Sequence, residues 1–287
     1  MNKAKKILIT GSGGFLGKNL LNALKNDKRF DVIALSSSIH EFSADNVVVL
    51  DNDEGLNVSW SDLDVVLNCA FPRTEDACLM PSGLSYINEV LKKAADENVE
   101  TVVNISSQSV YSQKRKNAAD ENSQISLESK YAVAKFSTEL MTNAVCRKNR
   151  HTNIRLASLI GPGFDQRLLN KFVVQALKNE KIKAIDSGQI YGLLDVADAV
   201  DGIIKVILDN ESFDENYNLG IIDGYSVLEL TNAVIELCGG NNDVIVLKGD
   251  DYINTTMNCE CFYDRFGWNP KVSLQESIIR IIREQNR

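Results

Sequence analysis

ILITGSGGFLG, the stretch from Ile7 to Gly17, decides the fold of this chain. Its apolar run ends in four glycines within seven residues, and an amphipathic pattern then continues through Leu24. This order predicts a strand, a tight turn and a helix, which together bring backbone N–H groups and a helix N-terminus close to a phosphate. A glycine-rich turn that binds no ligand is the alternative.

Each glycine of this stretch has a predicted task. Gly11 supplies the tight turn, Gly14 lacks the Cβ that would keep a pyrophosphate away, and Gly17 lets the helix lie close to the sheet. With the extra glycine and the first helical residues, they form the predicted cofactor-binding set of this stretch: Gly11, Gly13, Gly14, Phe15 and Leu16.

The chain has 287 residues, enough for one large domain or for a domain with a smaller lobe. Its formal net charge of -8 argues against nucleic acid or an anionic membrane as the main partner. No apolar run approaches the roughly 20 residues that cross a bilayer, and the start of the chain does not have the pattern of a signal peptide. We therefore expect a cytoplasmic protein.

Cysteine and histidine usage predicts no metal site. The six cysteines lack paired metal-ligand spacing, and Cys259 and Cys261 are too close together for the usual metal clip. Reduced thiols are the expectation. His40 and His151 are the two histidines of the chain, which argues against a Ser-His-Asp triad.

Apolar strands alternate with helical patterns over the first 160 residues. The predicted strands are continuous apolar runs at 7–10, 32–35, 47–50, 65–69 and 101–106, and a sixth strand is predicted at 154–159. The predicted helices lie at 15–27, 81–97 and 128–149. Strands buried on both faces have this composition, so we expect a parallel sheet with helices on each side. Right-handed crossovers make it a Rossmann-like, doubly wound α/β sheet. The segment 36–46 is predicted to be a loop or a frayed helix.

The pattern changes at Gly161-Pro162-Gly163. Beyond it, helices are predicted at 164–180, 195–209, 227–237 and 273–284, with short β structure in 181–193 and strands at 217–219 and 244–247. We predict a dinucleotide-binding domain of residues 1–160, to which 193–220 returns. Residues 161–192 and 221–287 are predicted to form a small C-terminal α/β substrate lobe.

The end of the second predicted strand bears on which dinucleotide binds. An acidic residue about 20 positions after the glycines commonly binds the ribose 2′-OH of NAD, but here the strand ends in Ser36, Ser37 and Ser38. These hydroxyls could donate to a 2′-phosphate, although no arginine stands nearby. Ser36 is therefore a predicted contact, and NADP(H) is slightly favoured over NAD(H), with a plain polar loop as the alternative. Asp51 could accept from the adenine amino group, or it could be a solvated strand-end carboxylate.

Tyr131 and Lys135 form a candidate catalytic pair. They stand four residues apart on a predicted helix and share one face. An ammonium there stabilises a phenolate, which makes the tyrosine a candidate general acid or base. Ser107 follows the fifth strand, at the sheet edge where ligands bind in such folds. Each of these features alone is common, but together they predict one cleft.

These motifs resemble the extended short-chain dehydrogenase/reductases, in particular the NAD-dependent epimerase/dehydratase group that acts mostly on nucleotide-sugars. The resemblance covers nearly the whole chain. Its landmarks are TGxxGxxG at 10–17, the strand-four segment 66–70, Ser107 before Tyr111, the Y-x-x-x-K pair, Arg155 before the Gly-Pro-Gly segment, and the segments 194–198, 217–220 and 266–270. Members of this family usually form homodimers through two helices per subunit, and the helices at 81–97 and 128–149 are the expected pair here.

The resemblance implies a reaction and the residues that carry it. Tyr131 is expected to move a proton at a sugar hydroxyl or keto oxygen, Ser107 to orient that oxygen, and Lys135 to hold the nicotinamide ribose. Hydride passes between the nicotinamide and the carbon that bears this oxygen. The implied site also includes Cys69 and Ala70 beside the cofactor, and Ser109, Arg155 and Ser158 beside the substrate.

Departures from the family pattern narrow the subclass. Sugar dehydratases of the family usually carry Asp-Glu after the catalytic threonine, whereas this chain has Ser107-Gln108-Ser109. A 4,6-dehydratase is therefore not expected. We expect an NAD(P)-dependent 4-keto-sugar reductase of nucleotide-sugar metabolism and polysaccharide biosynthesis. The alternatives are a nucleotide-sugar 4-epimerase, a non-sugar carbonyl reductase and a non-catalytic dinucleotide sensor.

Overall fold

The computed structural model describes residues 3–37, 42–71, 79–239 and 243–286. The chain divides into two compact units. The first comprises residues 1–110, 127–155 and 203–217, and the second comprises residues 111–126, 156–202 and 218–287. The predicted division into a cofactor domain and a substrate lobe stays a prediction. Ser38 and His40 lie outside the described residues.

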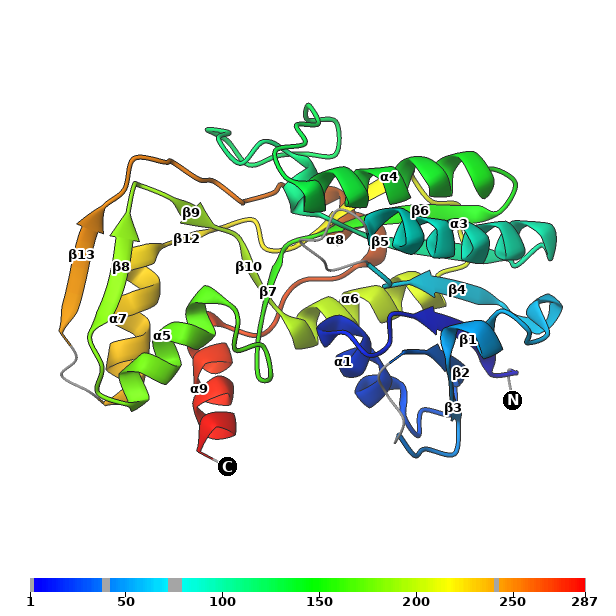
Figure 1. Cartoon of the computed structure of the whole chain (residues 1–287), viewed down its shortest axis with the longest axis horizontal. Helices are drawn as coiled ribbons and strands as arrows, with labels where there is room; N and C mark the ends of the chain where they lie inside the picture. Colours follow the sequence, from blue (N-terminus) through cyan, green and yellow to red (C-terminus); the bar gives the residue numbers. More distant parts are fainter. Residues whose placement is uncertain (1–2, 38–41, 72–78, 240–242, 287) are drawn as a thin grey trace. The chain divides into compact units, whose positions relative to one another are not determined.

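A seven-stranded sheet forms the centre of the first unit (Figure 1). In spatial order its strands are β11 (Asn216–Leu219), β6 (Arg150–Leu156), β5 (Thr101–Ser107), β4 (Val65–Asn68), β1 (Lys5–Thr10), β2 (Phe30–Leu35) and β3 (Val47–Leu50). The pairs β1–β2, β2–β3, β1–β4 and β4–β5 are parallel. The strand order reverses at β1, which is the switch point of a doubly wound sheet. The predicted Rossmann-like α/β fold is confirmed.

The central strands are buried on both faces, as their apolar runs predicted. Every residue of β4 and β5 is buried, and the three apolar residues that end β1 before Thr10 have no exposed surface. Polar residues interrupt these runs at Thr10, Asn68 and Asn104, which are also fully buried. Buried polar side chains are retained only where hydrogen bonds satisfy them, so these three positions point to an internal polar network.

Helices cover both faces of this sheet. α3 (Met80–Asp96) and α4 (Lys130–Val145) lie side by side on one face, and α1 (Phe15–Leu24) lies on the other (Figure 1). α6 (Val196–Leu208) continues from the second unit into the first. The short helix α2 (Asn52–Gly55) follows β3, and 3-10 turns lie at Trp60–Asp62 and Gln108–Val110.

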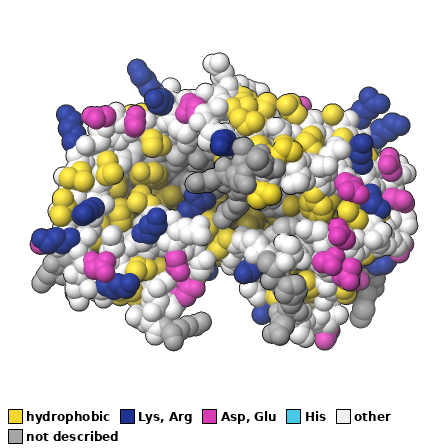
Figure 2. Space-filling view, viewed as in Figure 1, with side chains coloured by type: hydrophobic (Ala, Val, Ile, Leu, Met, Phe, Trp, Pro, Cys, Tyr) yellow, Lys and Arg dark blue, Asp and Glu magenta, His cyan; other side chains and the backbone are white. Residues whose placement is uncertain are grey.

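The second unit combines short strand pairs with helices. β7 (Ser158–Ile160) pairs with β10 (Leu193–Asp195), β9 (Ile190–Tyr191) with β12 (Tyr225–Ser226), and β8 (Ile182–Asp186) with β13 (Val244–Lys248). Its helices are α5 (Leu168–Leu177), α7 (Val227–Cys238), α8 (Glu260–Phe266) and α9 (Leu274–Gln285). Phe172, Leu230 and Ile278 belong to its buried core. Hydrophobic side chains also reach the surface over β8 and β13 (Figure 2).

Some predicted elements differ from the structure. The predicted sixth strand, 154–159, forms parts of two strands that are separated by Ala157. β6 ends at Leu156, and β7 begins at Ser158 and pairs with β10 instead of the large sheet. Residues 42–46 of the predicted loop or frayed helix form no helix. α8 was not predicted, because its seven residues give too short a run for helical periodicity.

Candidate active site

The glycine turn after β1 is fixed by close backbone contacts. Gly11 has φ of +65°, and a Cβ there would lie 2.6 Å from the backbone nitrogen of Ala70. A Cβ at Gly17 would lie 2.6 Å from the Cα of Ser12. At Gly14, by contrast, the nearest atom would be the Gly11 oxygen at 3.3 Å. The fold itself thus requires glycine at 11 and 17, whereas a Cβ at position 14 would meet one tight backbone contact and otherwise open space.

A cavity of about 510 Å³ opens beside this turn in the first unit. The turn, the end of β2, α2, the segment after β4 and α3 all contribute to its wall, including Gly11, Gly13, Gly14, Ser36, Ser37, Asn52, Asp53, Ala70, Phe71 and Tyr86. Its size lies in the range of small-molecule and cofactor sites. Because α1 begins at Phe15, directly after the turn, the positive end of its dipole favours an anion such as a pyrophosphate there.

The part of this cavity formed by α2 and α3 contains Asn52, Asp53 and Tyr86, which the sequence did not predict as site residues. Asp51 caps α2, with its carboxylate accepting from the Glu54 N–H at 2.7 Å, and the next two residues, Asn52 and Asp53, line the cavity. Tyr86 donates to Asn52 Oδ1 at 3.2 Å. Burial raises the pKa of Tyr86, helped by nearby carboxylates, so its phenol stays a donor. The Asp-x-x-Glu spacing of a capping box was the available signal for α2.

Lys135 and Tyr131 lie on the first turns of α4 and meet the cavity at Phe71. Lys135 is 4% exposed, and its ammonium donates to the Ile105 carbonyl at 2.7 Å. It lies 4.9 Å from the centre of the Phe71 ring. Tyr131 is 37% exposed, and its ring meets Phe71 edge-on with centroids 4.7 Å apart. Phe71 also lines the cavity, and sequence reasoning missed this residue.

Ser107 ends β5 two residues after the carbonyl that binds Lys135. Its Oγ accepts from the Ser109 N–H at 3.2 Å and from the Ser109 hydroxyl at 3.0 Å. The Ser107 proton can then donate to another oxygen. Ser109 thus fixes the Ser107 side chain. The predicted contact of Ser109 with substrate stays a prediction.

Cys69 and Ala70 connect β4 to this site. Burial raises the pKa of the Cys69 thiol to about 12, with Lys135 opposing the shift in part. The thiol is therefore neutral, and its predicted contact with the cofactor stays a prediction. The Ala70 N–H donates to Thr10 Oγ1 at 3.2 Å, which holds the end of β4 against the glycine turn.

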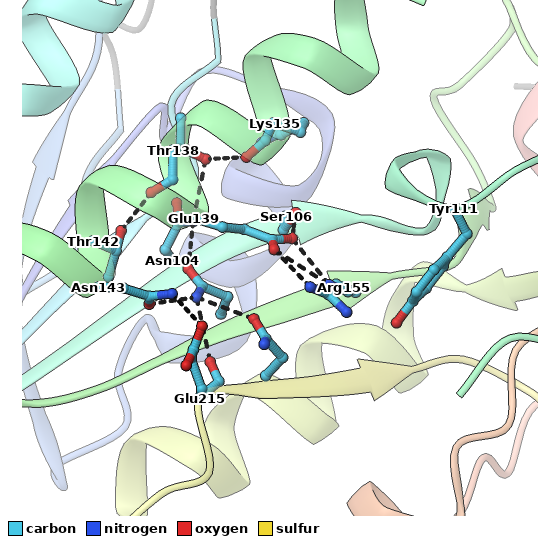
Figure 3. Close-up of polar contacts among 12 residues, drawn as sticks. Asn104, Ser106, Tyr111, Lys135, Thr138, Glu139, Thr142, Asn143, Arg155 and Glu215 are labelled. Atoms are coloured by element: carbon cyan, nitrogen blue, oxygen red, sulfur yellow. Dashed lines mark hydrogen bonds and ion pairs between the residues drawn. The ribbon is translucent and has the colours of Figure 1, made fainter. Parts of the chain in front are cut away.

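Arg155, predicted to contact substrate, has an interior side chain (Figure 3). Its guanidinium donates to both carboxylate oxygens of Glu139, with the shortest distance 2.8 Å. Ser106 also donates to this carboxylate. The exposed fractions are 4% for Arg155 and 1% for Glu139. The cluster joins β5, α4 and β6, and the substrate contact of Arg155 stays a prediction.

Ser158 lies in the second unit, where β7 pairs with β10 at Leu193. Its predicted role in substrate binding stays a prediction. Among the described residues, no group of three or more His, Cys, Asp or Glu side chains is arranged to hold a metal ion. Within the same residues, no helix combines the length and apolar character needed to span a bilayer.

Comparison with known proteins gives consistent matches. Residues 7–220 match the model of the NAD dependent epimerase/dehydratase family. Human dTDP-D-glucose 4,6-dehydratase is 24% identical over 313 residues, which cover 97% of this chain and 89% of that protein. UDP-N-acetylglucosamine 4-epimerase from Bacillus cereus has a similar structure, with a TM-score of 0.84, 21% identity, and coverage of 97% of this chain and 98% of that one.

A second Bacillus cereus structure shows the fold with ligands bound. It is UDP-glucuronic acid 4-epimerase in complex with UDP-glucuronic acid and NAD, with a TM-score of 0.84 and 18% identity. The match covers 98% of this chain and 99% of that chain. At these identities, the two structural likenesses establish a common fold.

Proposed function

We propose that this chain reduces the keto group of a nucleotide-linked 4-keto sugar. The chain belongs to the NAD dependent epimerase/dehydratase family and is an enzyme of that family. One observation carries the proposal. Phe71 lines the cavity beside the glycine turn and also contacts Tyr131 and Lys135. A single side chain therefore joins a dinucleotide-sized cavity to a phenol and an ammonium, the groups that a carbonyl reduction requires.

The cavity fits an NAD(P) dinucleotide. Gly11, Gly13 and Gly14 form a cradle in which a Cβ at position 14 would occupy ligand space, and the N-terminus of α1 follows directly. Ser36, Asn52 and Tyr86 would hold the adenosine half. When bound, the nicotinamide supplies the hydride.

The charge of the cavity favours NAD(H) over NADP(H). The serines at the end of β2 line the cavity, as the NADP(H) prediction supposed, but Asp53 lines it too. A carboxylate accepts a bond from a ribose 2′-OH and repels a 2′-phosphate. The described lining residues include no lysine or arginine to offset that repulsion. We therefore propose NAD(H) as the preferred form.

Tyr131, Ser107 and Lys135 divide the remaining chemistry among them. Tyr131 donates a proton to the keto oxygen as hydride reaches the carbon, a role supported by its exposed position and by the contact of its ring with Phe71, which lines the cavity. Ser107 donates a hydrogen bond to the same oxygen, since Ser109 already satisfies its acceptor capacity. Lys135, held by the Ile105 carbonyl, places a positive charge beside the phenolate that forms.

Nucleotide-sugars are the proposed substrate class because the similar proteins are named for them. The human relative is a dTDP-D-glucose dehydratase, and both Bacillus cereus structures are 4-epimerases of UDP-sugars. Gln108 follows Ser107 in this chain, where a dehydratase would need an acid. The reductase is therefore preferred to a dehydratase.

A nucleotide-sugar 4-epimerase is the second candidate. The observation in its favour is that the two similar structures described above are both 4-epimerases. The same three side chains serve that reaction, in which hydride leaves the sugar and returns to its other face. The two candidates differ in whether the dinucleotide is consumed.

A homodimer through α3 and α4 and a cytoplasmic location remain part of the proposal. Val133 and Leu140, two helical turns apart on α4, are 42% and 55% exposed. Figure 2 shows hydrophobic side chains at the surface over this helix. An apolar stripe of this kind is suited to packing against a second subunit.

The experiment is to identify the dinucleotide that copurifies and then to follow oxidation of NADH and NADPH with a panel of nucleotide-linked 4-keto sugars. Net oxidation of NADH with one of these sugars supports the reductase. Tight NAD with no net oxidation, but with interconversion of 4-epimers, supports the second candidate. Absence of both reactions from a protein that binds the dinucleotide would overturn the proposed function.

A further inference from the structure

The buried residues of α4 are small or polar: Ala132, Ala134, Lys135, Thr138, Glu139 and Thr142. The larger Met141 and Val145 are partly buried and pack against the core that includes α3, toward the end of the helix. Large side chains that interlock with a neighbouring surface normally fix a helix along its axis, because packed interiors leave few voids. Small apolar contacts hold a helix less firmly in one position, because hydrophobic attraction has no direction. Buried directional polar contacts therefore help to set the position of α4.

Thr138 makes such a contact with the neighbouring strand. Asn104 Nδ2 on β5 donates to Thr138 Oγ1 at 3.2 Å, and this hydroxyl donates to the Lys135 carbonyl at 2.8 Å (Figure 3). Asn104 and Thr138 are both fully buried. One hydroxyl thus connects the sheet to the helical turn that carries Lys135.

The Asn104 amide is itself fixed from two sides. Its Oδ1 accepts from Asn68 Nδ2 at 2.9 Å, and its Nδ2 also donates to Asn153 Oδ1 at 2.9 Å. Rotation of this amide would leave buried polar groups unpaired, which is unfavourable where water cannot replace the lost partner. Asn104 therefore presents its N–H to Thr138 in a defined direction.

The same network reaches the glycine turn. Thr10 Oγ1 donates to Asn68 Oδ1 at 2.7 Å and accepts from the Ala70 N–H at 3.2 Å. The strand register places Thr10 opposite Asn68, and Asn68 opposite Asn104. Because Thr10 directly precedes Gly11, a continuous series of hydrogen bonds runs from the start of the glycine turn to α4.

Glu139 adds a second polar contact at the next residue of the helix. Its carboxylate accepts from Ser106 on β5 and from Arg155 on β6. Thr138 and Glu139 therefore hold one turn of α4 to two adjacent strands. This turn follows directly after the turn of Lys135.

We propose that Thr138 is a positioning residue, which fixes α4 along its axis and so sets Tyr131 and Lys135 relative to the glycine turn. The inference rests on the proposed function, which gives the chemistry to those two side chains. Apolar side chains of the same shape could replace a buried polar pair with little change in stability. The geometry that the Thr138 contact imposes is therefore its function here.

Thr142 provides a matched control on the same helix. It is fully buried on the same face, but its hydroxyl donates at 2.8 Å to the Thr138 carbonyl, within α4. Valine is close to threonine in size but lacks the hydroxyl. Thr138→Val removes the contact with β5, whereas Thr142→Val removes a buried hydroxyl and leaves that contact in place.

The experiment compares Thr138→Val, Thr138→Ser and Thr142→Val in the full-length protein. We expect Thr138→Val to lower kcat by roughly ten- to a hundredfold, the range that an ångström-scale misplacement produces. NADH affinity should fall less than kcat, because the residues that line the cavity lie outside α4 and only the expected contact of Lys135 with the nicotinamide ribose would move. Thr138→Ser, which keeps the hydroxyl, should restore turnover, and Thr142→Val should keep it.

Crystal structures of the variants give a readout that does not depend on activity. The distance from Lys135 Nζ to the Ile105 oxygen, 2.7 Å in the wild type, should lengthen in Thr138→Val and not in Thr142→Val. An unmoved helix with equal turnover in the two valine variants would overturn the inference. If Thr138→Val does not fold, Thr138→Ala replaces it in the same comparison. A wild type that turns over no nucleotide-sugar would refute the proposed function instead, and the crystallographic comparison would still decide the position of α4.

Discussion

The buried pair of Arg155 and Glu139 should be strongly coupled in stability. The perturbation is a double-mutant cycle of Arg155→Met, Glu139→Gln and the double variant. The Arg155→Met variant leaves a buried carboxylate without its cation, and Glu139→Gln leaves a buried guanidinium without its anion. In the double variant the glutamine amide oxygen can still accept from Ser106, which donates to Glu139 in the native protein.

The magnitude follows from burial and geometry. The guanidinium and carboxylate approach to 2.8 Å, and both side chains are nearly inaccessible to water. Breaking one partner of such a buried pair typically costs about 3–5 kcal/mol, whereas an exposed pair contributes about 0–1 kcal/mol. We expect each single variant to approach the larger range. The double variant should lose less than the sum of the singles by roughly 1–3 kcal/mol, because it leaves no uncompensated charge.

The assay is urea unfolding of the four proteins at one pH, with the slope of the transition checked for constancy. A loss of about 4 kcal/mol would remove a large part of the total stability of an ordinary domain. Single variants that each lose less than about 1 kcal/mol would show that the pair behaves like a surface ion pair. A double variant that loses the full sum would show that the two side chains are not coupled.

Three further predictions follow from other positions. Gly17→Ala should destabilise the fold, because its Cβ would lie 2.6 Å from a backbone carbon. Gly14→Ala should lower the Tm less, because its Cβ would meet one backbone oxygen at 3.3 Å, and it should weaken dinucleotide binding in a titration; equal losses of Tm would contradict this. Asp53→Asn should reduce the preference for NAD over NADP, so that the ratio of the Kd for NADP to the Kd for NAD becomes smaller. An unchanged ratio would show that Asp53 does not contact the dinucleotide. Burial raises the pKa of Asp198, and nearby carboxylates add to the shift. Between the pKa of the unfolded chain and the higher pKa of the folded state, the folded protein keeps a proton that the unfolded chain releases. Stability therefore falls as pH rises between these two pKa values. The Tm of Asp198→Asn relative to wild type should therefore rise over the same pH range, and a constant difference would refute the assignment.

Much of the first unit was predictable from local pattern. β1, β4 and β5 are continuous apolar runs, and the glycine turn between β1 and α1 has its own signature. Burial on both faces and right-handed crossovers leave few arrangements for such a chain. α2 escaped prediction because four residues cannot show a helical period, although the Asp51 capping box indicated its start.

The internal polar network could not be predicted in the same way. Thr10, Asn68 and Asn104 each appear in a predicted strand, but their pairing depends on the register between strands, which long crossovers set. Sequence spacing does not give that register. Glu139 was closer to recognition, because it stands four residues after Lys135 and therefore on the same helical face.

The predicted site consists of residues that belong to motifs along the chain, such as Tyr131 and Lys135, and their catalytic roles stay predictions. Residues that meet through the fold were missing from it. Phe71 contacts both of these side chains from the end of β4, and Asp53 enters the cavity from α2. No local pattern assigns either residue to the site, because Phe71 follows β4 and Asp53 lies on the short helix α2, outside any motif.

Transfer of deuterium from deuterated NADH to a nucleotide-linked 4-keto sugar, followed by mass spectrometry, tests the central claim most directly. The wild type should place one deuterium on the sugar and release NAD. Tyr131→Phe should still bind NADH but transfer no label at a comparable rate, because the keto oxygen then lacks its proton donor. Equal labelling by Tyr131→Phe, or no labelling of any sugar by a wild type that binds NADH, would contradict the assignment of Tyr131 as the acid of a hydride transfer.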